Sequence, residues 1–170
     1  MTYATEKAVV GRKPLTVLEI DLDYCSNLYG GGLLSPLDGT CAATASEKCY
    51  NTRKTCVDTT NYTKTTKTYR FCQPRADLPK GFNMYPVIQG MPDLSPVGAP
   101  VYGVGDRGKV TITLRDFPHN DRGVDPYVDD RTYDPESQGT FFGKLFARNP
   151  YYINRPFRIR TGFITDTFSW

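Results

Sequence analysis

The chain has 170 residues, of which 39% are hydrophobic, so it suits a single domain with one modest core. Its 21 basic and 18 acidic residues leave a net charge of only +3, which is too balanced to indicate nucleic-acid binding from electrostatics. No apolar run approaches the length of a membrane span, and 15 Gly with 13 Pro indicate many turns and little long helix.

The first predicted elements are an N-terminal arm, residues 1–14, and a strand from Leu15 to Tyr24. The strand is predicted because Leu18, Ile20 and Leu22 recur at period two. The residues that alternate with them are interpreted as the solvated face of a half-buried strand: Glu19, Asp21 and Asp23. The strand leads directly into the first cysteine of the chain.

All five cysteines lie between residues 25 and 72: Cys25, Cys41, Cys49, Cys56 and Cys72. This stretch has few large apolar residues, so disulfides, zinc or an iron–sulfur cluster would have to order it. The odd count, and N-terminal residues unlike a signal peptide, disfavour the disulfides of a secreted module. A tight zinc pair and the familiar ferredoxin spacings are both absent. Spacing alone therefore leaves a metal or cluster and structural or partly paired cysteines both open.

Basic residues are frequent in this loop, which is predicted to run to about Lys67. They are Lys48, Arg53, Lys54, Lys64 and Lys67. Positive charge beside a thiol favours the thiolate, so these residues are expected to lower the pKa values of the cysteines. The same charge would offset that of an anionic cluster.

Further strands are predicted by β propensity and by period-two alternation. They are a short strand at Lys67–Cys72, an edge strand at Met84–Gln89, a strand at Lys109–Asp116 and a last strand at Phe157–Thr165. One helix is predicted from Thr140 to Arg148, and its apolar face consists of Phe141, Phe142, Leu145 and Phe146. The expected fold is mainly β, with one short helix and a long cysteine-containing loop.

Three polar features are interpreted without catalysis. His119, the only histidine, is expected to be a surface side chain. The acid-rich segment from Asp121 to Ser137 only partly imitates a calcium loop, so a solvated loop is predicted. The Arg-rich face formed by Arg155, Arg158 and Arg160 is assigned to a subunit contact, with the acidic segment of a neighbouring copy as its partner.

Two stretches of the chain resemble a known family: Leu18 to Cys25 and Lys48 to Cys56. They are similar to the cysteine loop of lambda-like tail-tip and baseplate-hub proteins, found in long non-contractile phage tails and gene transfer agents. The text from Thr111 to Asp116, and on through Tyr151 to Phe163, resembles the same proteins. The resemblance covers most of the chain from about Leu15 onward, taken as one β-rich hub domain, residues 15–170.

That resemblance implies a [4Fe–4S] cluster in the loop, held by four cysteines. The matching positions are Cys25, Cys41, Cys49 and Cys56, and Cys72 is a fifth cysteine beyond the pattern. The gap from Cys25 to Cys41 is longer than in the family because of the Gly30 to Pro36 insert, and this bears on the match of Cys41.

The function implied is that of a structural virion component rather than an enzyme. It would be assembled in the host bacterial cytoplasm as a homo-oligomer, a trimer by resemblance, with other tail-tip and tail-tube proteins, without nucleic acid or a membrane span. No phosphate loop, nucleophile elbow or dinucleotide fingerprint occurs in the sequence. The alternatives are an iron–sulfur or zinc redox protein and a secreted disulfide module. Because hub proteins usually continue further, the chain is also a candidate fragment of a longer one.

Overall fold

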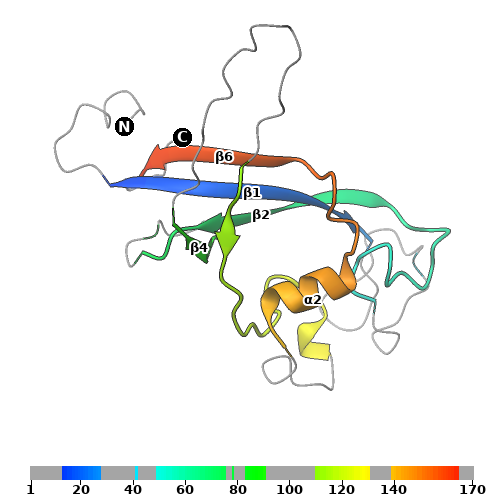
Figure 1. Cartoon of the computed structure of the whole chain (residues 1–170). Helices are drawn as coiled ribbons and strands as arrows, with labels where there is room; N and C mark the ends of the chain where they lie inside the picture. The colour runs from blue at the N-terminus through cyan, green and yellow to red at the C-terminus, as the bar shows by residue number, and fades with distance from the viewer. Residues whose placement is uncertain are drawn as a thin grey trace, which may run out of the picture. The chain divides into compact units, whose positions relative to one another are not determined.

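The computed structural model describes residues 13–27, 41, 49–75, 78, 83–90, 110–130 and 139–164 (Figure 1). Its strands are β1 (Pro14–Cys25), β2 (Lys64–Cys72), β3 (Tyr85–Pro86), β4 (Ile88–Gln89), β5 (Thr113–Leu114) and β6 (Phe157–Phe163). The helices in these residues are the 3-10 helix η2 (Val128–Asp130) and the α-helix α2 (Phe141–Arg148). Residues 1–12, most of the predicted arm, lie outside the description.

The fold is mainly β, as the sequence predicts. Four strands form one sheet in the order β3-β2-β1-β6, and β4 pairs with β5 in a second sheet. The chain divides into two compact units, the first made of Met1–Leu18, Arg70–Arg115 and Ile159–Trp170, and the second of Glu19–Tyr69 and Asp116–Arg158. In the described part of the chain, no helix has the length and apolar character needed to cross a membrane.

The first unit has a small apolar core at the start of β1. Leu15, Val17 and Cys72 are at most 1% exposed, and the partly buried residues packed against them are Leu78, Met84 and Ile164. β2 pairs in parallel with β3 and places Phe71 opposite Tyr85, with ring centroids 5.9 Å apart. Cys72 is thus a core residue of this unit.

The predicted strand at Lys109–Asp116 is much shorter than expected. Of its described residues, 110–116, only Thr113 and Leu114 form a ladder, antiparallel to Gln89 and Ile88. Apolar and polar residues do alternate in burial from Val110 to Leu114, but the partner strand β4 is short. β4 lies between Pro86, which lacks an N–H, and Gly90, whose φ of 82° is left-handed.

In the second unit, α2 forms where the sequence predicts a helix. Its N-terminus is capped from outside, because Asp116 Oδ1 accepts the N–H of Phe142 at 3.0 Å and the carbonyl of Phe117 accepts that of Phe141 at 2.8 Å. Burial acts to raise the pKa of Asp116, but hydrogen bonds from the Thr140 hydroxyl and from the backbone N–H groups of Phe142 and Phe117 leave the pKa lowered. A negative group at a helix N-terminus also complements the helix dipole.

The buried face of α2 carries Phe141, Phe142 and Leu145, and Figure 1 shows the helix beside β1 and β2. Phe141 stacks on Phe117 with ring centroids 5.2 Å apart and meets Tyr69 edge-on at 5.9 Å. Phe146 shares this face as predicted, since its ring stacks on that of Phe142 with centroids 6.0 Å apart, but it is 44% exposed.

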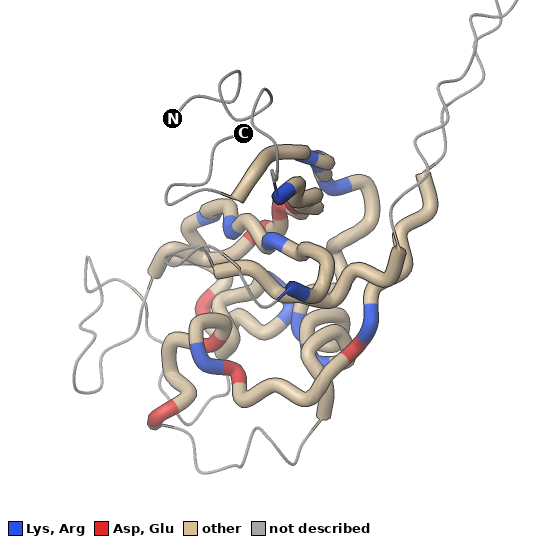
Figure 2. Tube along the Cα trace, turned by 90° about the vertical axis from the view of Figure 1, so that its left-hand side faces the viewer, with Lys and Arg blue, Asp and Glu red and all other residues tan. Residues whose placement is uncertain are grey.

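The predicted strands at the two ends of the chain are confirmed, but their polar residues differ from expectation. Glu19 is 3% exposed and accepts a hydrogen bond from Arg158 Nε at 3.0 Å. Arg158 also pairs with Asp21 at 2.7 Å, and Arg155 pairs with Asp23 at 2.6 Å. Figure 2 shows basic and acidic residues interspersed along the trace.

One prediction is therefore wrong. The carboxylates of β1 are not a solvated face, because arginines near and within β6 cover them. Arg155 and Arg158 make these ion pairs within their own chain, and their predicted contact with another subunit stays a prediction. The sequence did not show this because β1 and β6 lie at opposite ends of the chain.

Candidate functional site

Four of the five cysteines belong to the second unit: Cys25, Cys41, Cys49 and Cys56. Cys25 is the last residue of β1, and Cys49 and Cys56 lie at the two ends of segment 49–56. Cys49 is buried, and the other three thiols are partly exposed. The fifth, Cys72, is in the first unit and its burial raises the pKa of its thiol to about 11.

A tight turn separates Cys49 from Cys56. Asn51 adopts a left-handed φ of 56°, which asparagine tolerates better than most residues. Thr55 then stabilises the turn twice, by accepting the N–H of Tyr50 at 3.0 Å and by a 2.9 Å hydrogen bond between its hydroxyl and that of Thr52. The six residues between the two cysteines are thereby folded into a compact bend, and we call the whole segment, residues 49–56, the cysteine turn.

Hydrogen bonds fasten the cysteine turn to the end of β1. The N–H of Cys25 donates to the carbonyl of Asn51 at 2.6 Å. The side-chain amide of Asn51 donates back to the carbonyls of Cys25 at 3.3 Å and Asn27 at 2.8 Å. Three of the cysteines are therefore carried by two segments that are bonded directly to each other.

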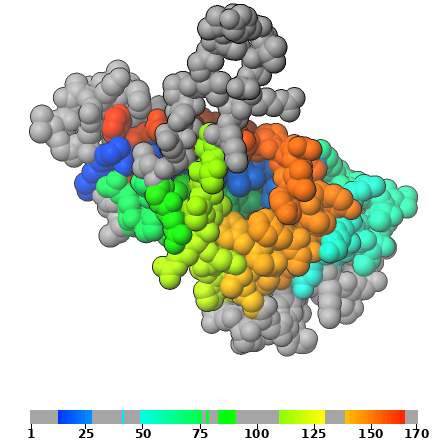
Figure 3. Space-filling model, in the orientation of Figure 1, coloured from blue at the N-terminus to red at the C-terminus, as the bar shows by residue number. Residues whose placement is uncertain are grey.

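The other side of the cysteine turn is fastened to the C-terminus of α2. The hydroxyl of Thr52 donates to the carbonyl of Arg148 at 2.6 Å, and Lys54 Nζ donates to that of Ala147 at 3.0 Å. The last carbonyls of a helix have no partner within it, so these bonds cap α2. In Figure 3 the atoms of the helix region (orange) and of the turn (cyan) are in contact.

The thiols of the second unit interact electrostatically. The pKa of Cys49 is raised to about 11, mainly by burial, with smaller contributions from the neighbouring Cys56, Cys41 and Cys25. Burial also raises the pKa of Cys56, with contributions from Cys25 and Cys41. Charge on the neighbouring cysteines thus opposes the ionisation of Cys49 and Cys56, and a cation that binds thiolates would relieve this repulsion.

The expectation that basic residues lower these pKa values is wrong for Cys49 and Cys56. Lys54 is occupied at the end of α2, and Arg53 lies over the ring of Tyr62, 5.6 Å from its centroid. Desolvation then dominates at both thiols. Lys48 lies outside the described residues.

The donor set fits the group that the resemblance implies. A [4Fe–4S] cluster takes four thiolates, and this unit contains four cysteines, of which Cys49 and Cys56 are influenced by the others. Within the described residues, no three His, Cys, Asp or Glu side chains are arranged to hold a single metal ion.

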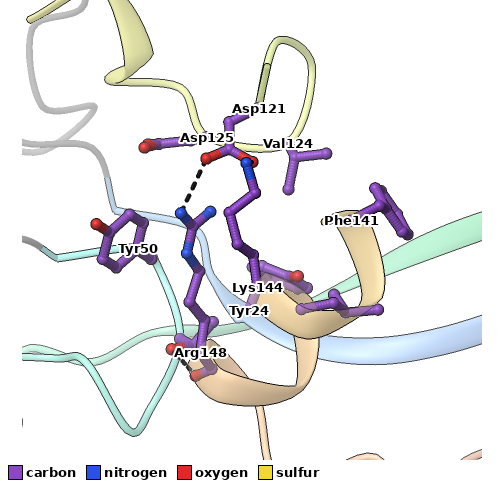
Figure 4. A pocket seen from close by; sticks show the side chains of 10 residues that line it. Tyr24, Tyr50, Asp121, Val124, Asp125, Phe141, Lys144 and Arg148 are labelled. Atoms are coloured by element: carbon purple, nitrogen blue, oxygen red, sulfur yellow. Dashed lines mark hydrogen bonds and ion pairs between the residues drawn. The ribbon is translucent and has the colours of Figure 1, made fainter. Parts of the chain in front are cut away.

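A second polar site was not predicted from the sequence. Asp121 is only 2% exposed, has a left-handed φ of 62° and pairs with two cations of α2, Arg148 at 2.8 Å and Lys144 at 3.0 Å (Figure 4). Arg148 also lies over the ring of Tyr50, 3.9 Å from its centroid. The cavity here has a volume of about 10 Å³, so the cluster is a packed ion-pair network with space for about one water.

The expectation of a solvated acidic loop is thus wrong at Asp121 and at Asp125, which is 3% exposed. Burial alone would raise the pKa of Asp121, but the hydrogen bonds and charges of Arg148 and Lys144 leave it lowered. A signal for this site existed in the sequence. Lys144 and Arg148 are four residues apart, so they share one face of the helix. Two positive charges on one face predict an anionic partner.

His119 is also not the surface side chain that was expected. Its side chain is 13% exposed, and its ring meets Phe141 edge-on at 5.2 Å. Its Nδ1 accepts the N–H of Asp121 at 2.9 Å, which requires that nitrogen to be unprotonated. Burial lowers the pKa of His119 in agreement with this bond.

Comparisons of the chain with protein-family models, with curated proteins and with solved structures found no match.

Proposed function

We propose that the chain is a structural component of a phage tail tip or baseplate hub, in which Cys25, Cys41, Cys49 and Cys56 bind a [4Fe–4S] cluster. The observation that supports the proposal is that these four cysteines belong to one unit and the others influence Cys49 and Cys56, while Cys72 belongs to the core of the other unit. The resemblance of Leu18–Cys25 and Lys48–Cys56 to tail-tip proteins supports the virion assignment.

The role proposed for the cluster is to order the cysteine loop. When bound, it would supply four iron–thiolate bonds that cross-link distant parts of the loop. Fixing each backbone residue costs roughly 1–2 kcal/mol in conformational entropy, and the loop has few apolar side chains to offset that cost. The residues of the chain provide the frame, because Asn51 holds Cys25 beside the turn and Thr52 holds the turn on α2.

The cluster is tested by anaerobic purification followed by iron, sulfide and zinc analysis. We expect iron and acid-labile sulfide in equal amounts, with broad visible absorption. Serine variants of Cys25, Cys41, Cys49 and Cys56 should each lose the iron, whereas a matched variant of Cys72 should keep it. Zinc without sulfide would show that the site is a structural zinc site and not a cluster. A free-thiol titration that finds disulfides in the native protein would contradict both assignments.

The architectural role is tested separately, by measuring the copy number of the protein in purified phage particles. A fixed stoichiometry at the tail tip, in a multiple expected for a symmetric ring, supports the proposal. The rival role is electron transfer, which requires an accessible cluster and a docking partner. Reversible redox exchange with a small carrier, together with absence from the particle, would favour that rival.

A further inference from the structure

A cavity of about 440 Å³ lies in the second unit beside the end of β1. Its size is within the range of about 300–1,000 Å³ that is typical of small-molecule sites. The residues on which the inference depends are Asp23, Arg53, Tyr62, Lys64, Tyr151 and Arg155. The cavity is distinct from the Asp121 network, since the two have no lining residue in common.

The charge of this cavity is positive. Arg53, Lys64 and Arg155 contribute three positive charges and Asp23 one negative charge, which leaves a net charge of +2 (3 − 1). Asp23 Oδ2 serves two of the cations, Arg155 at 2.6 Å and Lys64 at 3.2 Å. One carboxylate cannot neutralise both, so a second anion would be attracted to them.

The cations are partly held in place before any ligand binds. Arg155 Nε also donates to the carbonyl of Tyr151 at 2.8 Å, so its guanidinium is fixed at two points. Arg53 lies over the ring of Tyr62 and makes no ion pair with a described carboxylate. A guanidinium that lies over an aromatic ring can still donate its N–H groups to an oxyanion.

We propose that this cavity binds a small molecule carrying a phosphate monoester. Such a group has a charge of about −1.5 to −2 at neutral pH, which matches the surplus of the cavity. Arg53 and Lys64 would contact its oxygens, because guanidinium and ammonium groups are the usual partners of phosphate. The rings of Tyr62 and Tyr151 would flank the organic part of the molecule.

The test is a calorimetric titration of the full-length protein with phenyl phosphate, inorganic phosphate and phenol. We expect phenyl phosphate to bind in a saturable and salt-sensitive manner, more tightly than either of the others. Arg53→Gln and Lys64→Gln should each weaken its binding by about tenfold, the size of one charge-assisted hydrogen bond. Arg122→Gln removes the same charge from an exposed residue that does not line the cavity, and it should leave binding unchanged.

A gain-of-affinity variant makes the test independent of misfolding. Asp23→Asn removes the carboxylate that faces the ligand, so phenyl phosphate should bind more tightly, by about tenfold. Unchanged or weaker binding by this variant overturns the proposal, as does equal binding of phenol or an equal loss in Arg122→Gln. Iron and sulfide are measured on the same samples, so failure here is distinguishable from failure of the cluster.

Discussion

The hydroxyl of Thr52 donates to the backbone carbonyl of Arg148 at 2.6 Å, across 96 residues of sequence. Through this bond the cysteine turn and the C-terminus of α2 depend on each other. Thr52 is 1% exposed, so a loss of its hydroxyl would leave a helix carbonyl without compensation from solvent.

We expect Thr52→Val to lower the free energy of unfolding by about 1–3 kcal/mol, because the Arg148 carbonyl loses the hydrogen bond that the buried Thr52 hydroxyl donates to it. Urea denaturation monitored by circular dichroism measures the change. Thr66→Val, at an exposed position of β2, is the control and should change stability by no more than about 0.5 kcal/mol. Equal stability of the two variants would show that the bond does not contribute.

Replacement of Cys72 should separate stability from iron binding. Cys72 is 0% exposed in the core with Leu15 and Val17, so Cys72→Ser places a hydroxyl in an apolar site and should cost about 1–3 kcal/mol. Its iron content should equal that of the unmodified protein. If Cys72→Ser contained as little iron as Cys49→Ser, Cys72 would be a ligand and the proposed set of four ligands would be wrong.

Asp121 should be the most sensitive carboxylate among those described here. Asp121→Asn keeps a side chain that tolerates the left-handed backbone but leaves Lys144 and Arg148 without their shared anion, so we expect a loss of about 3–5 kcal/mol. The control is Asp129→Asn, which breaks an exposed pair with Arg122 and should cost less than about 1 kcal/mol.

The same residue should affect acid stability. The pKa of Asp121 is lowered in the folded protein, so its contribution is complete above the unfolded value of about 3.9. As pH falls below that value, the unfolded chain binds the proton first and the contribution is lost through the folded pKa. Asp121→Asn should therefore lose stability less steeply below pH 4 than the unmodified protein, as measured by urea titrations at several pH values.

His119 should control stability in a separate pH window. Its pKa is lowered in the folded protein, so below about pH 6.5 the unfolded chain binds a proton that the folded chain resists. Unfolding free energy should fall between pH 7 and pH 5. His119→Gln keeps an acceptor for the Asp121 N–H but cannot titrate in this range, so its stability should be flatter. Parallel curves for the two proteins would exclude His119 as the cause.

The sequence predicted elements better than it predicted polar contacts. The period-two pattern of Leu18 and Leu22 located β1, and the apolar spacing of Phe141 and Leu145 located α2. Both signals are local, because they come from residues a few positions apart. The burial of Glu19 has no local signal. It depends on Arg158, whose position next to β1 is decided by tertiary folding.

The candidate site shows the same division. The cysteines could be singled out from sequence, because so few large apolar residues accompany them. Their grouping into four and one depends on Cys72 entering the core of the first unit, which spacing does not reveal. The Asp121 network was missed for a related reason, since an acid-rich stretch beside prolines looks solvated until its cations on α2 are in place.

The long reach of the bonds around the cysteine turn has a consequence for biosynthesis. A ribosome that has just made Thr52 must add 96 more residues before the carbonyl of Arg148 exists. Asn149, whose side-chain amide donates to the carbonyl of Asp23, follows Asp23 by 126 positions. Contacts of such sequence separation form late and slowly. The cysteine turn therefore gains its full support only after Asn149 has been synthesised, so a cluster delivered earlier would meet an unsupported loop.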